Sequence, residues 1–218
     1  MICGVDEAGR GPVLGPLVVA GVKVKDDKKL QEIGVKDSKK LSPKRREILS
    51  TRIKQLVAEY VIIVIPAKDI DDMRKVMTLN EIEVNAFTQV IKKLKPEICY
   101  VDSTDVEEKR FARDILAGLT FNVEMVSKHK ADENYPIVSA ASILAKTKRD
   151  EEVEKIATKL QERLDLPFGS GYPADVVTQK FLKSWYDKFG KMPPHTRHSW
   201  KTVDNLINEA KNRKLDEF

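Results

Sequence analysis

The chain has 218 residues, of which 41% are apolar and 33% charged, with a formal net charge of +5. That length suits one large domain or a domain with an appendage, and no apolar run approaches the ~20 residues of a membrane-spanning helix. The positive charge permits a polyanionic partner without specifying one. Both cysteines, Cys3 and Cys99, lie in apolar runs. We therefore expect small buried thiols, not a disulfide or metal pair, in a cytoplasmic protein.

The first 24 residues predict two strands joined by an acidic tip and a glycine-rich turn. Ile2–Val5 leads into Asp6 and Glu7, and Gly9–Gly11 precedes a second apolar run, Leu17–Val24. Adjacent strand residues face opposite sides, so both acids share a site only if the strand ends there and the turn redirects Glu7. The glycines allow such a turn and expose N–H groups to a phosphate or sugar. Because structural residues begin at once, we expect no signal peptide; a plain polar strand end is the alternative interpretation.

The segment after this hairpin is strongly basic. Residues 36–54 carry eight Lys or Arg against two acids. Ser42 and Pro43 form an N-cap and first-turn pair, which predicts a helix ending at about Glu59. A solvated helix face and a phosphate-binding surface are both compatible with this charge.

The middle of the chain predicts alternating strands and helices. Tyr60–Ile65 is a β-branched run typical of a strand covered on both faces. Thr78 and Glu81 form a capping-box pattern that begins the next helix. Ile98–Val101 is another apolar strand, and it ends on Asp102. A helix over about 106–116 and a strand over about 121–126 follow.

The last part of the chain predicts a long helix and a helical tail. A polar patch at 128–134 precedes this helix, with Pro136 in its first turn and small residues at 139–142 that permit close backbone approach. The clearest break is Phe168–Pro173. We predict a catalytic core over 1–166 and a helical, substrate-binding region over 167–218, packed with the core as one unit.

Four acids stand out because of where they lie: Asp6, Glu7, Asp102 and Asp132. The first three lie at strand tips, where sites gather in open α/β sheets, and the fourth lies near the start of the long helix. Carboxylates suit Mg²⁺, and four of them could hold two ions around a scissile phosphate. Any one of them alone would be a surface charge or a helix cap. The histidines lack zinc-site spacing, and no P-loop is present.

Six motifs, in order, resemble type 2 ribonuclease H (ribonuclease HII), and they extend from residue 2 to about residue 200. They are DEAGRGPVLGP, DSKKL, YVDS, KHKADENYPIVSAASILAK, GSGYPAD and HTRHSW. The resemblance, which is to the shorter archaeal type, implies an α/β ribonuclease H-like fold, with a mixed central sheet flanked by helices and a C-terminal helical appendage. It also implies Mg²⁺- or Mn²⁺-dependent endonucleolytic cleavage of RNA–DNA hybrids. That activity includes nicking 5′ of a single ribonucleotide in duplex DNA, leaving 3′-hydroxyl and 5′-phosphate ends.

The same resemblance assigns roles to individual residues. Asp6, Glu7, Asp102 and Asp132 would be the catalytic acids that bind two metal ions. Gly9, Arg10, Gly11 and Tyr172 would read the 2′-hydroxyl, the group that distinguishes RNA from DNA. Tyr172 could instead be a loop residue covering the core, and Ser139 and Ser142 could hydrogen-bond the nucleic-acid backbone or serve only helix packing. Further contacts with the nucleic acid are expected from Lys39, Lys40, Ser139, Lys146 and Arg149.

The C-terminus suggests a partner. Leu215 and Phe218 match the leucine and first aromatic of a sliding-clamp-binding peptide, but Asn212 replaces the usual Gln and the second aromatic is missing. A frayed tail is the alternative. We expect a monomer with no membrane association.

Three rival functions are compatible with parts of this pattern. Type 3 ribonuclease H shares the core but usually carries an extra N-terminal domain, and it cuts poorly at a lone ribonucleotide. A non-catalytic nucleic-acid-binding subunit would not need all four acids. A small-molecule phosphatase would not need the basic surface at 36–54.

Overall fold

The computed structural model describes residues 1–35 and 41–215, with side chains described as far as residue 212. The chain forms two compact units, each built from three separate segments. The first unit contains Met1–Ala8, Val18–Val64 and Met77–Asp150. The second contains Gly9–Leu17, Ile65–Val76 and Glu151–Phe218. These units are discontinuous in sequence, and the sequential division at residue 166 remains a prediction.

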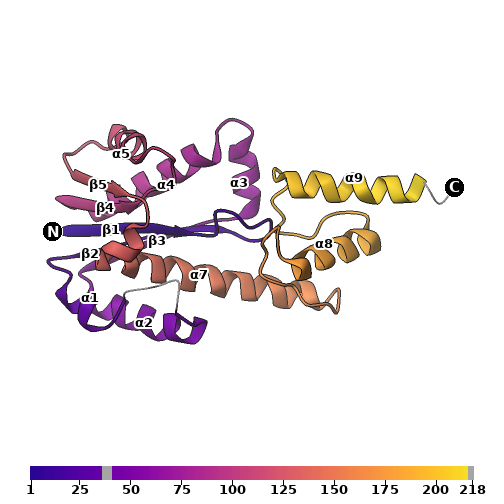
Figure 1. Cartoon of the computed structure of the whole chain (residues 1–218), viewed down its shortest axis with the longest axis horizontal. Helices are drawn as coiled ribbons and strands as arrows, with labels where there is room; N and C mark the ends of the chain where they lie inside the picture. The colour runs from indigo at the N-terminus through magenta and orange to yellow at the C-terminus, as the bar shows by residue number, and fades with distance from the viewer. Residues whose placement is uncertain (36–40, 216–218) are drawn as a thin grey trace. The chain divides into compact units, whose positions relative to one another are not determined.

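The first unit is built on a five-stranded sheet with the order β3-β2-β1-β4-β5 (Figure 1). At its centre, β1 (Ile2–Ala8) pairs antiparallel with β2 (Leu17–Val24) and parallel with β4 (Ile98–Asp102). Strand β5 (Glu124–Lys128) continues the sheet parallel to β4, and β3 (Glu59–Ile65) lies at the opposite edge. The predicted mixed α/β sheet is therefore confirmed.

Strand β3 differs from its prediction. It was expected to be covered on both faces, but it is an edge strand, and the side chains of residues 59–64 are exposed or only partly buried. The prediction is wrong because a β-branched run reports the preference for an extended backbone and not the position of a strand in its sheet.

Helices cover both faces of the sheet. Within the first unit, α4 and α5 lie on one face, while α1, α2 and the first part of α7 lie on the other (Figure 1). The predicted Ser42 cap and the Thr78–Glu81 capping box are both present. The helices with residues in this unit are α1 (Lys28–Glu32), α2 (Pro43–Leu56), α4 (Leu79–Leu94), α5 (Glu108–Ala117), α6 (Ala131–Asn134) and α7 (Pro136–Gln161).

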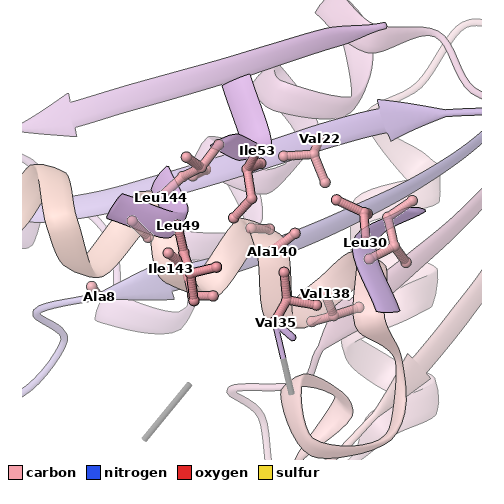
Figure 2. Close-up of a cluster of buried hydrophobic side chains, with 14 of the residues drawn as sticks. Ala8, Val22, Leu30, Val35, Leu49, Ile53, Val138, Ala140, Ile143 and Leu144 are labelled. Carbon is pink, nitrogen blue, oxygen red and sulfur yellow. The ribbon is translucent and has the colours of Figure 1, made fainter. Parts of the chain in front are cut away.

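The core of the first unit brings α2 and α7 against the sheet. Figure 2 shows Val22 of β2 beside Ile53 of α2, with Ala140 and Leu144 of α7 in the same buried cluster. Small residues let the helix approach closely: a Cβ placed on Gly4 of β1 would lie 2.5 Å from the carbonyl of Ile137. This close approach lies at Ile137 and Val138, just before the small residues 139–142 that were expected to allow it, and the glycine that permits it is on the strand.

The two cysteines lie opposite each other on neighbouring strands. Cys3 of β1 is in register with Cys99 of β4, and both are fully buried free thiols with their Sγ atoms 2.9 Å apart. Burial raises the pKa of the Cys99 thiol well above its usual value. The expected role as small buried side chains is confirmed.

The second unit has its own helical core. This unit contains the helices α3 (Ala67–Arg74), α8 (Val176–Phe189) and α9 (Lys201–Leu215), and the last part of α7. Val13 and Leu14, from the turn after β1, pack in this core against residues that include Phe181 and Trp185. Among the described helices, none has the length and apolar character needed to cross a membrane.

Candidate active site

Three carboxylates meet at the end of the central strands. Asp6 lies on β1, Asp102 ends β4, and Asp132 belongs to the short helix α6. Each offers a carboxylate oxygen, and these oxygens all lie within 4.8 Å of one another. Asp6 and Asp132 are only 4% and 2% exposed. Because β1 and β4 are adjacent and parallel, they deliver their acids to the same edge of the sheet (Figure 1).

Backbone hydrogen bonds fix two of these carboxylates. The Asp102 carboxylate accepts the N–H of Ala131 at 2.9 Å, which ties the end of β4 to the start of α6. Lys130, just before α6, adopts a left-handed conformation with φ 55° and turns the chain into this helix. The Asp6 carboxylate accepts the N–H of Glu7 at 2.7 Å. Asp132 therefore reaches the site through a turn that Asp102 itself anchors.

Glu7 occupies a different position from the one expected. Strand β1 continues through Ala8, which pairs with Val18, so the strand does not end at the two acids and the turn begins only at Gly9. Glu7 therefore keeps the alternation of the strand and is not a member of the three-carboxylate group found among the described residues. Its charge is nevertheless close enough to raise the pKa of Asp6.

The site concentrates negative charge in a buried place. Burial is the main cause that raises the pKa of Asp6 well above 3.8, followed by repulsion from Glu7 and Asp102. A hydrogen bond from Ser142 and the charge of Lys146 act in the opposite direction. Three carboxylate oxygens within 4.8 Å of one another are the donor set of a hard divalent cation, so these residues fit Mg²⁺ or Mn²⁺.

Lys146 and Ser142 belong to this cluster. The Lys146 ammonium donates to the Ser142 hydroxyl at 2.7 Å and lies 3.8 Å from an Asp132 carboxylate oxygen. The two residues are one turn apart on α7, so an i, i+4 pair in the small-residue stretch was the available signal. The sequence interpretation left Ser142 between a hydrogen bond to the nucleic-acid backbone and helix packing, not a hydrogen bond to Asp6, and it placed Lys146 on the phosphate backbone.

A second arrangement of interest lies in the other unit. The turn after β1 approaches Tyr172: a Cβ on Gly11 would lie 3.6 Å from the tyrosine ring. Gly9 has φ 89°, a left-handed conformation that favours glycine. The Tyr172 side chain is 42% exposed, so it does not serve mainly to cover the core. The turn and the tyrosine together present a small, accessible surface made of backbone and one aromatic ring.

The Tyr172 loop is held firmly at the start of α8. The Asp175 carboxylate accepts the Ser170 N–H at 2.6 Å and its hydroxyl at 2.8 Å, and these bonds are the main causes that lower the pKa of Asp175 to about 2. The Gly171 carbonyl in turn accepts the N–H groups of Val13 and Leu14. The glycine turn and the tyrosine loop are therefore parts of one hydrogen-bonded structure.

The comparison with known families gives one clear result. A sequence model described as ribonuclease HII matches residues 3–203. The chain belongs to the ribonuclease HII family. It is therefore a ribonuclease H, an endonuclease and hydrolase of the archaeal type that its motifs predict.

Relatives of this family are similar over the full chain. The ribonuclease HII of Thermococcus onnurineus is 46% identical over 229 residues, covering 100% of this chain and 98% of its relative. The crystal structure of ribonuclease H2 from Pyrococcus horikoshii matches with a TM-score of 0.88 at 42% identity, covering 96% and 98% of the two chains. Ribonuclease HII from Archaeoglobus fulgidus, solved in a complex with PCNA, matches with a TM-score of 0.85 at 44% identity, covering 94% of this chain and 96% of that one. The ribonuclease H-like fold with a helical C-terminal part is confirmed.

The other predicted nucleic-acid contacts divide into three groups. Ser139 is 1% exposed and its hydroxyl donates to the Val35 carbonyl, the arrangement of a residue in helix packing. Arg149 is 8% exposed, so only a small part of it can reach a ligand. Lys39 and Lys40 lie outside the described residues. In the tail, α9 ends at Leu215, whose side chain lies outside the described part, as does the whole of Phe218.

Proposed function

We propose that this ribonuclease HII family member cleaves RNA in RNA–DNA hybrids and nicks duplex DNA on the 5′ side of a single ribonucleotide. The products carry 3′-hydroxyl and 5′-phosphate ends. The observation that carries the proposal is the buried cluster of Asp6, Asp102 and Asp132, an oxygen-rich site suited to metal-assisted phosphodiester hydrolysis. Nothing in this cluster reads base identity, so we expect cleavage that does not depend on sequence.

The acids hold divalent ions in this proposal. Asp6, Asp102 and Asp132 are the central ligands, and Glu7 adds a fourth carboxylate for a pair of Mg²⁺ or Mn²⁺ ions. Bound ions of this kind activate the attacking water and stabilise the leaving oxygen. Ser142 and Lys146 keep the carboxylates of Asp6 and Asp132 in place, through the hydrogen bond to Asp6 and the ammonium 3.8 Å from Asp132.

The glycine turn recognises the ribose. We assign this role to Gly9, Arg10 and Gly11 because a turn rich in glycine leaves its N–H groups accessible to a sugar hydroxyl. Tyr172 completes the recognition, since its exposed ring faces Gly11 and its hydroxyl can bond a 2′-oxygen. Lys146 and Arg149 are secondary contacts with the phosphate backbone.

A single substrate tests this function. A duplex with one ribonucleotide, incubated with Mg²⁺ and separately with Mn²⁺, should be nicked 5′ of that ribonucleotide. Asp102→Asn should abolish the nick, because it removes one charge while its amide oxygen can still accept the Ala131 N–H.

Two control substrates sharpen this result. An all-DNA duplex should stay intact under both metals, and a duplex with four consecutive ribonucleotides should also be cut. Cleavage of the four-ribonucleotide duplex alone would favour type 3-like specificity. No cleavage of any substrate by a folded protein would overturn the proposal.

We also propose that the C-terminal tail binds a sliding clamp in the cytoplasm. Its support is the A. fulgidus relative solved in a complex with PCNA, together with the Leu215 and Phe218 pattern. Removing residues 212–218 should weaken clamp binding at least tenfold in a calorimetric titration, while cleavage of free substrate is retained. Unchanged affinity of the shortened protein would show that the tail is not the binding segment.

A further inference from the structure

The most unusual buried group outside the acid cluster is the guanidinium of Arg197. This side chain is fully buried in the second unit, and each of its nitrogens donates to a backbone carbonyl. Nη2 lies 2.6 Å from the oxygen of Gly9, Nη1 lies 2.9 Å from that of Arg10, and Nε lies 3.0 Å from that of Gly15. A buried charge is expensive unless it is well hydrogen-bonded, and here its partners are the carbonyls of one turn.

Trp200 continues the same set of contacts. Its indole N–H donates to the carbonyl of Gly11 at 3.2 Å, and the Arg197 guanidinium lies 4.8 Å from the centre of its ring. The carbonyls of Gly9, Arg10 and Gly11 therefore all accept hydrogen bonds from two side chains of the 197–200 segment. Three successive carbonyl groups of the turn are fixed in this way.

Fixing the carbonyls also fixes the N–H groups. In a planar trans peptide, the C=O of one residue and the N–H of the next point in opposite directions. The carbonyls of Gly9 and Arg10 face Arg197, so the N–H groups of Arg10 and Gly11 must face away from it. Gly11 is exposed, and within the described ranges its N–H has no acceptor.

The segment that carries Arg197 and Trp200 is itself anchored. The Asp71 carboxylate accepts the N–H groups of His198 and Ser199, at 2.7 and 2.9 Å, and the Ser199 hydroxyl at 2.7 Å. The N–H of Arg197 donates to the Val13 carbonyl at 2.8 Å. The guanidinium is therefore presented from a rigid support, as pre-organisation of a binding site requires.

We infer that Arg197 is a positioning residue for ribonucleotide recognition, assisted by Trp200. It holds the glycine turn so that the N–H donor of Gly11 is directed outward at the 2′-hydroxyl of a bound ribonucleotide. This inference rests on the proposed function of the turn. It adds a specificity determinant that lies nearly 190 residues from the turn in the chain.

The test measures preference for a ribonucleotide and not activity alone. In the full chain carrying Asp102→Asn, affinities are compared by fluorescence anisotropy for two duplexes that differ by one 2′-hydroxyl. Arg197→Lys keeps the charge, but its single ammonium cannot bond three diverging carbonyls, so the preference should fall about tenfold or more. Trp200→Phe keeps the ring and loses one hydrogen bond, so the preference should fall about two- to fivefold.

The outcomes separate the possible explanations. Affinity for the all-DNA duplex should stay within about twofold of the parent in both variants, since phosphate contacts are untouched. If affinity for both duplexes falls equally, or if the preference is unchanged, Arg197 has only a structural role and the inference is overturned. If Arg197→Lys does not fold, Trp200→Phe decides by the same criteria. A parent protein without any preference would instead overturn the proposed function of the turn.

Discussion

Replacing Asp6 with Asn is expected to abolish cleavage and, at the same time, to stabilise the metal-free protein. Activity should fall by about 10³-fold or more, on the scale of removing a group that stabilises charge in a transition state. Stability should rise because burial, followed by repulsion from Glu7 and Asp102, raises the pKa of the Asp6 carboxylate, which is 4% exposed. Asn retains the oxygen that accepts the Glu7 N–H.

The pH dependence of this effect has a definite sign. The folded protein holds the Asp6 proton more tightly than the unfolded chain, whose pKa is near 3.8. The metal-free protein therefore loses stability as pH rises from about 3.8 through the raised pKa, and the full penalty remains above it. In Asp6→Asn this part of the pH dependence should be absent.

Thermal melting at several pH values, in the presence of a chelator, tests both the higher stability of Asp6→Asn and its smaller dependence on pH. Each kcal/mol of repulsion removed should raise the melting temperature by about 2–4 °C in a protein of this size. Adding Mg²⁺ should stabilise the parent and have little effect on the variant. A variant that melts at or below the parent temperature at neutral pH would show that burial and repulsion from Glu7 and Asp102 do not destabilise the Asp6 carboxylate.

The matched control is the same substitution in the opposite environment. Asp175 accepts hydrogen bonds from Ser170 and Val177, and its pKa is lowered to about 2. Its charged form stabilises the folded state above its ordinary pKa, and this stability is lost as pH falls toward 2. Asp175→Asn should therefore lower the melting temperature at neutral pH, where Asp6→Asn raises it.

The parts of the site that the sequence predicts share a local cause. Asp6 and Asp102 each follow a short apolar strand, and carboxyl ends of neighbouring parallel strands meet at one edge of a sheet. The chain pattern alone could therefore place two acids together. Asp132 was singled out only by its place near the start of the long helix, where a polar residue is usually a cap, and no local pattern shows that it joins the other two acids. The end of β1 was expected at the two acids, but β1 pairs with β2 through Ala8, because the pattern does not show where a strand stops pairing.

Local sequence patterns could not predict the contacts within the second unit. Its core joins Val13 and Leu14 of the turn after β1 to side chains between Val153 and Ile207, and no periodicity predicts contacts over such separations. Arg197 lies in a proline- and histidine-containing stretch, where a lone cation is typical of an exposed loop. Its partners are backbone carbonyls, which carry no side-chain signature. Only the folded chain shows that this cation is fully buried and binds the glycine turn.

Replacing Gly11 with Ala is expected to leave the protein folded and to remove most cleavage at a single ribonucleotide. The added Cβ would lie 3.6 and 3.9 Å from two carbons of the Tyr172 ring, which are ordinary van der Waals distances, and Gly11 does not have a positive φ. Melting temperature should therefore change little. The methyl group would fill the space between the turn and the ring, which the proposal assigns to the ribose. Displacing a sugar by about 1 Å can reduce rate by about 10²-fold.

Two companion variants separate the contributions of shape, backbone and hydroxyl. Gly9→Ala should destabilise the protein instead, because Gly9 has φ 89° and an L-residue is strained there. Tyr172→Ala should reduce junction cleavage sharply with little change in duplex binding. Tyr172→Phe should retain the ring contact and lose only the contribution of the hydroxyl to junction cleavage.

Gly11→Ala and Tyr172→Ala variants that cut the single-ribonucleotide duplex at the parent rate would remove this surface from ribose recognition. Full cleavage with Gly11→Ala alone would mean that the ribose approaches Tyr172 from a side that Gly11 does not border.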